Sequence, residues 1–149
     1  MNSKGFTLIE IIVVIAIVGV LAGMAAVSYS GMTKDYEIES VKEQLIQTLK
    51  NTRTEAVARN RTVDFVEITS GNYTICWYNG GTPVTITNNI SFGLQNSNIK
   101  LRFNNLTGTR VTFDNWGKVS NASGGTPSIT ISKGTLSRTV TIETTGYIH

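Results

Sequence analysis

The sequence Lys4-Gly5-Phe6-Thr7-Leu8-Ile9-Glu10 leads directly into an apolar run that continues to Val27. Between Phe6 and Val27 the only charged side chain is that of Glu10. As a helix this run would extend about 33 Å, and the hydrocarbon core of a bilayer is about 30 Å thick. The sequence therefore predicts a short basic leader followed by a helix that crosses a membrane.

Two kinds of N-terminal segment share this pattern: a secretory signal that is removed, and an anchor that is retained. A secretory signal has a shorter apolar core and a small-residue cleavage site on its far side, which residues 22–26 match only loosely. Glu10 favours the anchor, because a carboxylate inside an apolar run costs several kcal/mol without a partner and so marks a functional position. We expect that partner to be a positive group of a neighbouring chain, such as a free α-amino terminus.

The stretch from Lys4 to Glu10 resembles, at every position, the prepilin motif of type IV pilins and of the pseudopilins of type II secretion. The resemblance implies that prepilin peptidase cuts between Gly5 and Phe6, and that Phe6 becomes the N-methylated first residue. It also implies that Glu10 pairs with the Phe6 amine of the adjacent subunit during filament assembly.

This chain differs in two features from the major pilins, although a major pilin is still an alternative interpretation. Those proteins usually carry a proline about one turn before the membrane exit, where this chain has Val27, so Gly19 and Gly23 are the remaining places for the helix to bend. Many also close a C-terminal loop with a disulfide, whereas Cys76 is the only cysteine here. We expect Cys76 to be a buried strand thiol rather than half of an intermolecular bridge.

Length and composition indicate one soluble domain beyond the anchor, because the chain has 149 residues. We divide it into a leader (1–5), an apolar helix half (6–27), an amphipathic helix half (28–60) and a β-rich head (61–149). Charged residues make up only 15% while Ser, Thr, Asn and Gly are abundant, which favours an extracytoplasmic β domain over a cytosolic enzyme. The formal net charge of +3 is small for a dedicated nucleic-acid surface.

Residues 28–60 contain no proline, and apolar or small side chains recur every three or four positions. These side chains are Ile38, Val41, Leu45, Leu49, Thr52 and Ala56. The spacing predicts that the helix continues to about Asn60 with one stripe to bury, and we expect Leu45 and Leu49 to pack against a sheet. Residues 28–31 are the place where the helix could loosen as it leaves the bilayer.

From Arg61 the hydrophobic period changes to two, which is typical of strands. The predicted strands cover residues 62–68, 73–78, 83–87, 99–103, 110–113, 128–132 and 138–143. Short turns join the first two and the last two as hairpins, and Pro83 makes the third an edge strand. The predicted fold class is α+β, with a long N-terminal helix packed on a C-terminal antiparallel β-sheet head, as the resemblance to pilins also implies.

Three later segments resemble the GspH/FimT group of minor pseudopilins and minor pilins: residues 53–63, residues 113–118, and residues 137–142 followed by Gly146. The resemblance implies a structural subunit that joins or primes a type IV pilus or a type II secretion pseudopilus. Its partners would be prepilin peptidase, other pilin or pseudopilin subunits, and inner-membrane lipid before assembly. The chain would cross the inner membrane once, with its head in the periplasm, and then move into the filament or its tip.

A second alternative is a DNA-binding minor pilin for natural transformation. Members of the group that bind DNA do so through a Gly-Arg-x-Arg pattern near the C-terminus, and the matching place here reads Gly146-Tyr147-Ile148-His149. Both arginines are absent, which weakens phosphate neutralisation. Lys118, Lys133 and Arg138 offer a weak patch for DNA or another anion, but a solvated strand face is the interpretation we favour. The sequence allows DNA as a partner without favouring it.

The sequence does not predict an enzyme. His149 is the only histidine and the last residue, where fraying argues against a catalytic triad. No metal-ligand spacing or phosphate-binding glycine loop appears, so we expect neither a metal nor a cofactor. Trp77 and Trp116 would suit base stacking, but we expect core or turn packing for both. A plain anchored envelope protein that never polymerises is a further alternative.

Overall fold

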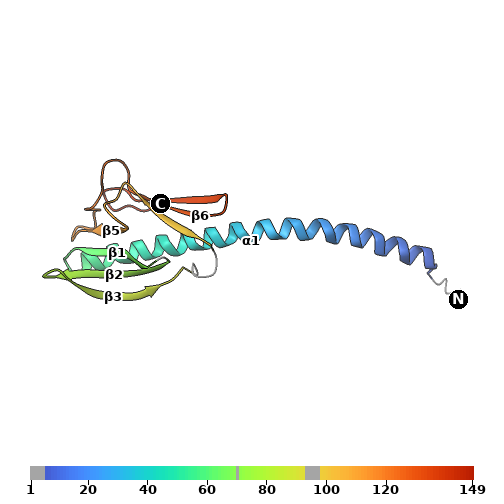
Figure 1. The fold of residues 1–149 in the computed structure, drawn as a ribbon, viewed down its shortest axis with the longest axis horizontal. Coiled ribbons are helices and arrows are strands. Elements are labelled where there is room, and N and C mark those ends of the chain that lie inside the picture. Colours follow the sequence, from blue (N-terminus) through green and yellow to red (C-terminus); the bar gives the residue numbers. More distant parts are fainter. Residues whose placement is uncertain (1–5, 70, 93–97) are drawn as a thin grey trace. The chain divides into compact units, whose positions relative to one another are not determined.

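The computed structural model describes residues 6–69, 71–92 and 98–149, and the side chains of residues 25–32, 69 and 89 lie outside this description. Within these described residues, one helix, α1 (Leu8–Ala58), is followed by seven strands (Figure 1). They are β1 (Val63–Thr69), β2 (Asn72–Asn79), β3 (Thr82–Ile90), β4 (Lys100–Asn104), β5 (Arg110–Phe113), β6 (Ser128–Lys133) and β7 (Leu136–Thr141). The chain divides into two compact units, one up to Tyr36 and one from Glu37 onward.

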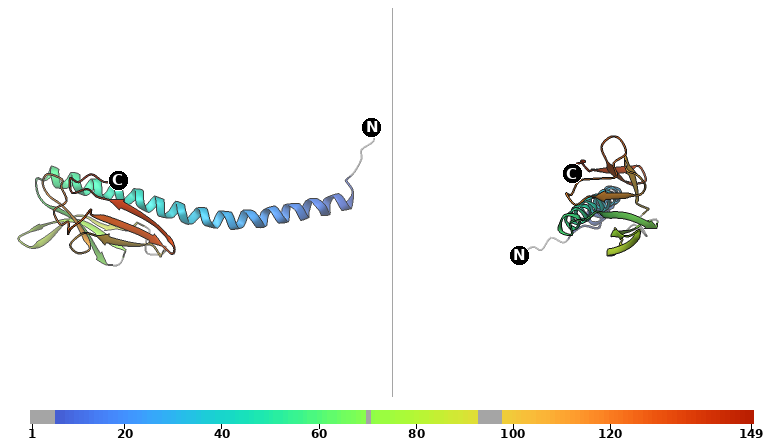
Figure 2. Two further views of the ribbon diagram at one scale, coloured as in Figure 1. Left: turned by 90° about the horizontal axis from the view of Figure 1, so that it is seen from above. Right: turned by 90° about the vertical axis from the view of Figure 1, so that its left-hand side faces the viewer.

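In the second unit, the part of α1 from Glu37 onward packs into a hydrophobic core as predicted. All six side chains of the expected stripe are buried, and Ile38, Leu45, Leu49, Thr52 and Ala56 have no exposed surface. Leu45 and Leu49 belong to the same core cluster as side chains of both sheets, which confirms that they pack against β structure. Figure 2 shows this part of α1 lying against the strands.

The helix ends two residues before the predicted boundary, for a local reason. Asn60 adopts a left-handed conformation with φ of 48°. Its N–H donates to the carbonyl of Val57 at 3.1 Å, and the Arg61 N–H donates to the carbonyl of Ala56 at 3.1 Å. This pair of bonds is the Schellman motif, which satisfies the last carbonyls and turns the chain away from the helix axis.

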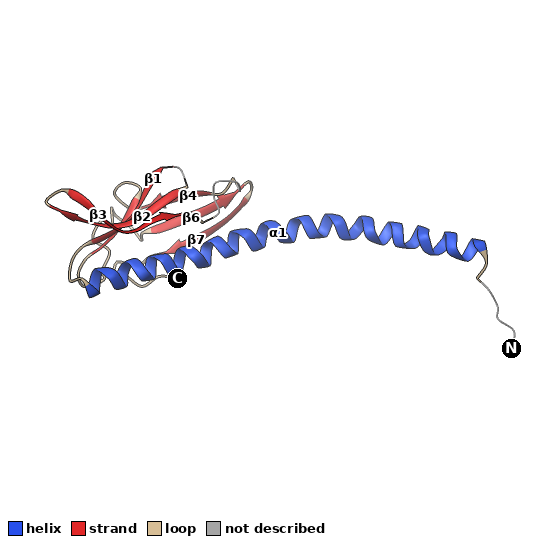
Figure 3. Cartoon of the chain, turned by 90° about the horizontal axis from the view of Figure 1, so that it is seen from below, coloured by secondary structure: helices blue, strands red, loops and turns tan. Residues whose placement is uncertain are grey.

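The strands form two antiparallel sheets (Figure 3), one in the order β3-β2-β1-β5 and one in the order β4-β6-β7. The predicted hairpins are confirmed as β1 with β2 and β6 with β7. The prediction that Pro83 marks an edge strand is confirmed, since β3 pairs only with β2 among the described strands. Pro83 lacks an N–H, so it is tolerated at an edge and not in the middle of a sheet.

The core between α1 and the sheets is rich in aromatic rings. Phe65 of β1 and Tyr73 of β2 stack with their centroids 5.2 Å apart, and Phe92 and Phe103 tilt against them. Cys76 is 1% exposed, so the prediction of a buried strand thiol is confirmed. Burial, together with the nearby charge of Asp64, raises the pKa of this thiol.

Two glycines and one arginine tie the turns of the head to α1. Gly117 and Gly146 both have positive φ, 74° and 85°. The Arg53 side chain donates from Nε to the carbonyl oxygen of Gly117 at 3.1 Å. A Cβ at position 146 would overlap that same carbonyl oxygen and would lie 2.9 Å from the Arg53 Nε. The turn after β5 and the C-terminal turn therefore meet on α1 only because neither glycine carries a side chain.

We expect Gly146→Ala to destabilise the head by about 3 kcal/mol or more, because a Cβ there displaces the Gly117 carbonyl and its bond to Arg53. Gly124→Ala is the matched control, since Gly124 also has positive φ but has open space around its Cβ position. That control should cost about 1–2 kcal/mol, from backbone strain alone. The measurement is urea unfolding of the full chain in micelles. Equal losses in the two variants would show that the close contact is unimportant.

Candidate functional site

The first turn of α1 contains a reciprocal capping arrangement. The Glu10 N–H approaches the Thr7 hydroxyl oxygen at 3.4 Å, and the Thr7 N–H approaches the Glu10 carboxylate at 3.4 Å. This is the capping box, in which the residue before the helix and the third helical residue satisfy each other's backbone donors. Glu10 therefore has a partner within its own chain, in addition to the one we expect from a neighbouring subunit.

The capping role of Thr7 was not among the features predicted from the sequence. The spacing of a threonine and a glutamate three residues later, just before an apolar run, is itself the sequence signature of a helix start. The position of Glu10 in the first turn is also electrostatically favourable, because a negative side chain stabilises the positive end of the helix dipole. The carboxylate therefore contributes to helix initiation, and its pairing with a neighbouring subunit stays a prediction.

The apolar side chains of the N-terminal unit are exposed in the single chain. Among the large apolar side chains from Phe6 to Met24, the exposed fractions range from 48% at Ile11 to 79% at Phe6. Exposed apolar surface is unfavourable by roughly 25 cal/mol per Å² relative to burial. This surface therefore requires a cover that the chain itself does not supply among its described residues.

The proposed boundaries of this segment are only partly described. Lys4 and Gly5 lie outside the described residues. Val27 lies within the described helix, but its side chain is not described, like those of residues 25 and 26. Among the residues that are described, no helix has both the length and the apolarity of a membrane span. α1 continues without a break through Gly19, Gly23 and residues 28–31, so the helix does not loosen there in this structure.

Two of the three basic residues proposed as a weak anion patch have carboxylate partners on α1. Lys133 forms an ion pair with Glu37, and Arg138 Nε lies 3.3 Å from a carboxylate oxygen of Glu39. Lys118 instead follows β5, where its N–H and that of Trp116 donate to Asp114. No contact between Lys118 and the other two cations is described. The helix carboxylates thus offset the positive charge of the β6–β7 hairpin.

Glu39 is the centre of a small charged network on α1. Its carboxylate lies 2.7 Å from Lys42 Nζ on the next turn and 3.3 Å from Arg138 of β7. The hydrogen bond from Lys42, joined by that from Arg138, lowers the pKa of Glu39 below its usual value of 4.5. The network therefore links the helix to the second sheet while Glu39 is ionised.

The two tryptophans differ in their surroundings. Arg61 places its guanidinium 3.9 Å from the ring centroid of Trp77, which is partly buried against the core. Trp116 lies in the turn after β5, as predicted, but it is 75% exposed, so the expectation that it packs there was wrong. Within the described part of the chain, no group of three or more His, Cys, Asp or Glu side chains could hold a metal ion.

Glu39→Gln should reduce stability at neutral pH and leave it unchanged at low pH. Because the folded state lowers the pKa of Glu39, its contribution is present above the usual value of 4.5 and is lost as the pH falls below it. The check is urea unfolding of the full chain across this range. Glu43→Gln is the control, since Glu43 is exposed and no ion pair is described for it. A difference from wild type that does not vary with pH would contradict the interpretation.

Comparisons with known proteins agree with this arrangement. The model of the prokaryotic N-terminal methylation motif matches residues 1–26, and the model of the type II transport protein GspH matches residues 42–146. Two crystal structures of the type IV minor pilin FimU from Pseudomonas aeruginosa resemble the chain, with TM-scores of 0.65 and 0.61. Each is 17% identical; the matches cover 79% and 74% of this chain and 90% of each FimU chain. No curated protein matches the sequence. The structural likeness confirms the predicted α+β pilin fold.

Proposed function

The chain belongs to the family of the type II transport protein GspH, among the type IV pilin-like minor pilins and pseudopilins, and from this we propose that it is a structural subunit that joins or primes a filament. Prepilin peptidase would release it by cutting between Gly5 and Phe6, with Phe6 then N-methylated. The filament would be a type IV pilus or a type II secretion pseudopilus. Its head would contact other pilin or pseudopilin subunits.

The observation that carries this proposal is the uncovered apolar surface of α1 between Phe6 and Met24. Before assembly, we propose that inner-membrane lipid covers it, with the head outside the cytoplasm. During assembly, the same side chains would move from lipid into a bundle of helices from neighbouring subunits. That transfer costs little, because lipid tails and an apolar helix bundle are similarly apolar environments.

Glu10 would give this bundle its register. An apolar helix surface packs at many axial offsets with similar energy, whereas a carboxylate in apolar surroundings requires a cation at one position. The free amine of a neighbouring Phe6 would supply that cation at the matching depth. The capping box with Thr7 keeps the carboxylate hydrogen-bonded until then.

The structural role has more support than the alternatives. Lys133 and Arg138, two of the three cations considered for DNA, have carboxylate partners on α1, which reduces the charge they can offer to phosphates. A major pilin stays less favoured, since Cys76 has no second cysteine to pair with. A plain envelope protein would have no use for the methylation motif.

The first experiment tests processing. We expect intact mass and N-terminal sequencing of the protein from its native membrane to show a chain that begins at N-methylated Phe6. In cells without prepilin peptidase the chain should keep residues 1–5. A chain cut near Ala26, or one uncut in both backgrounds, would contradict entry into the pilin pathway.

A second experiment separates the two roles of Glu10. Glu10→Gln keeps an oxygen that can accept from the Thr7 N–H but removes the charge, whereas Thr7→Val keeps the charge and removes the capping hydroxyl. We expect both variants to insert in the membrane, and only Glu10→Gln to be lost from sheared filaments relative to the membrane pool. Loss of Thr7→Val with normal incorporation of Glu10→Gln would show that capping, rather than pairing with a neighbour, is the function of this carboxylate.

A further inference from the structure

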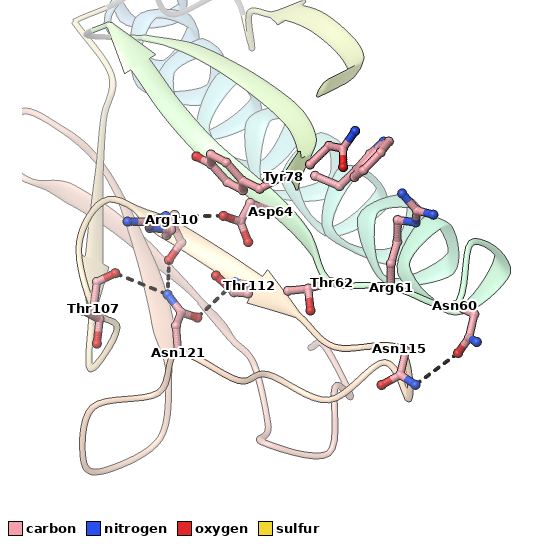
Figure 4. A pocket seen from close by; sticks show the side chains of 12 residues that line it. Asn60, Arg61, Thr62, Asp64, Tyr78, Thr107, Arg110, Thr112, Asn115 and Asn121 are labelled. Carbon is pink, nitrogen blue, oxygen red and sulfur yellow. Dashed lines mark hydrogen bonds and ion pairs between the residues drawn. The ribbon is translucent and has the colours of Figure 1, made fainter. Parts of the chain in front are cut away.

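A cavity of about 790 Å³ lies where α1 ends, between the outer ends of β1, β2 and β5 and the loops that follow β4 and β5. Figure 4 shows its lining side chains, which are mostly polar and come from segments far apart in the sequence. Its volume is within the range of small-molecule sites. No feature of filament assembly in the proposed function uses it.

Hydrogen bonds between the segments that form the walls of this cavity fix its shape. The Asn121 side-chain amide bonds to the backbone of two neighbouring segments. Its Nδ2 donates to the carbonyls of Thr107 and Arg110, and its Oδ1 accepts from the Thr112 N–H. On the other side, Asn115 donates to Asn60 at 3.1 Å and so joins the turn after β5 to the end of α1. The site is therefore preorganised rather than a gap between loose loops.

The floor of the cavity carries a buried carboxylate with spare capacity to accept hydrogen bonds. Asp64 of β1 is 4% exposed, and its Oδ2 lies 3.4 Å from Arg110 of β5, the only hydrogen bond or ion pair described for its side chain. A carboxylate has about four acceptor positions, and leaving them unfilled in a buried site is costly. Arg110 is 44% exposed in its side chain and has further N–H groups to donate.

Aromatic and cationic groups complete the lining. Tyr78 is 45% exposed. Burial, followed by electrostatic interactions with Cys76 and Asp64, raises the pKa of Tyr78, so its hydroxyl stays protonated and can donate. Arg61 is stacked on Trp77, which holds its guanidinium in place at the rim. The cavity thus presents a buried acceptor, several donors and the faces of aromatic rings side by side.

The charges in this arrangement select among ligand classes. The lining includes Arg61, Arg110 and Asp64, which sum to one positive charge, with the carboxylate at the most buried position. At the buried end of the cavity, a phosphate or a carboxylate would lie against the Asp64 carboxylate and be repelled by it, whereas a cation would be repelled by the two arginines. A ligand with hydroxyl groups avoids both penalties, because each hydroxyl donates and accepts at once.

We propose that this cavity binds a neutral oligosaccharide. One sugar hydroxyl donates to Asp64 and accepts from Arg110, so that the buried carboxylate gains a second hydrogen-bond partner beside Arg110. The amide side chains and the Tyr78 hydroxyl bind further hydroxyls, and the ring of Tyr78 contacts the apolar C–H face of the sugar. Polar side chains at the rim, including that of Arg61, bind the solvent-exposed end of the oligosaccharide.

The two tryptophans provide a test with an internal control. Trp77 lines the cavity and Trp116 does not, so in the full chain, labelled with ¹⁵N, only the Trp77 indole N–H resonance should shift on titration with sugar. Trp116→Phe, at a residue that is 75% exposed, assigns the two signals. The probes are maltotriose, cellotriose and tri-N-acetylchitotriose, in micelles of a zwitterionic detergent, because detergents with sugar headgroups would compete.

We expect at least one probe to bind saturably with a Kd of about 1 mM or lower. Asp64→Asn and Tyr78→Phe should each weaken it roughly tenfold. The matched controls are Tyr147→Phe, an exposed tyrosine outside the cavity, and Arg102→Ala on β4. Absence of saturable shifts with all three probes, equal shifts of both tryptophans, or tighter binding of a uronic-acid trisaccharide or of single-stranded DNA would overturn the proposal. Sugar binding does not require assembly, so this test is independent of the function proposed above.

Discussion

The apolar stripe of α1 between Ile38 and Ala56 has to be covered, and both sheets of the head contribute to covering it. A helix alone cannot bury its own stripe, and most helical stability in proteins comes from such packing. Inward-facing side chains of the β1–β2 hairpin and the β6–β7 hairpin belong to the same core cluster as this stripe, and the rings of Phe65 and Tyr73 stack within it. The Arg53 bond to Gly117 then holds the closing turns to the same helix.

The N-terminal half of α1 presents the opposite situation. Its apolar residues surround the helix on all sides rather than forming one stripe, so no single sheet would cover them. A lipid phase or a bundle of like helices covers such a surface from every direction, and this requirement motivates the proposal of a membrane-inserted subunit that later polymerises. Glu10 alone breaks the uniformity, and its bond to Thr7 shows that its charge has a local use as well.

The polar residues of the head divide into those that hold the fold and those that retain unused bonding capacity. Glu37 and Glu39 neutralise the charges of Lys133 and Arg138. The side-chain amide of Asn121 forms hydrogen bonds with backbone groups through both its nitrogen and its oxygen. Asp64 differs, since it is buried with one long contact to Arg110. Buried carboxylates are costly unless they have partners, so an incompletely bonded one beside a cavity indicates a site for a ligand.

Local patterns in the sequence were sufficient to predict α1, the positions of the strands that the structure describes, the two predicted hairpins and the edge position of β3. Hydrophobic periods of 3.6 and 2, short turns and the missing N–H of Pro83 act over a few residues, which is why sequence alone determined these features. The capping role of Thr7 was equally local and could have been predicted. The division into two sheets, the pairing of Lys133 with Glu37, the exposure of Trp116 and the cavity around Asp64 depend on segments up to about a hundred residues apart. Polar residues in loops show no periodic pattern in the sequence. Which of them come into contact was decided only by the packing of the whole head around α1.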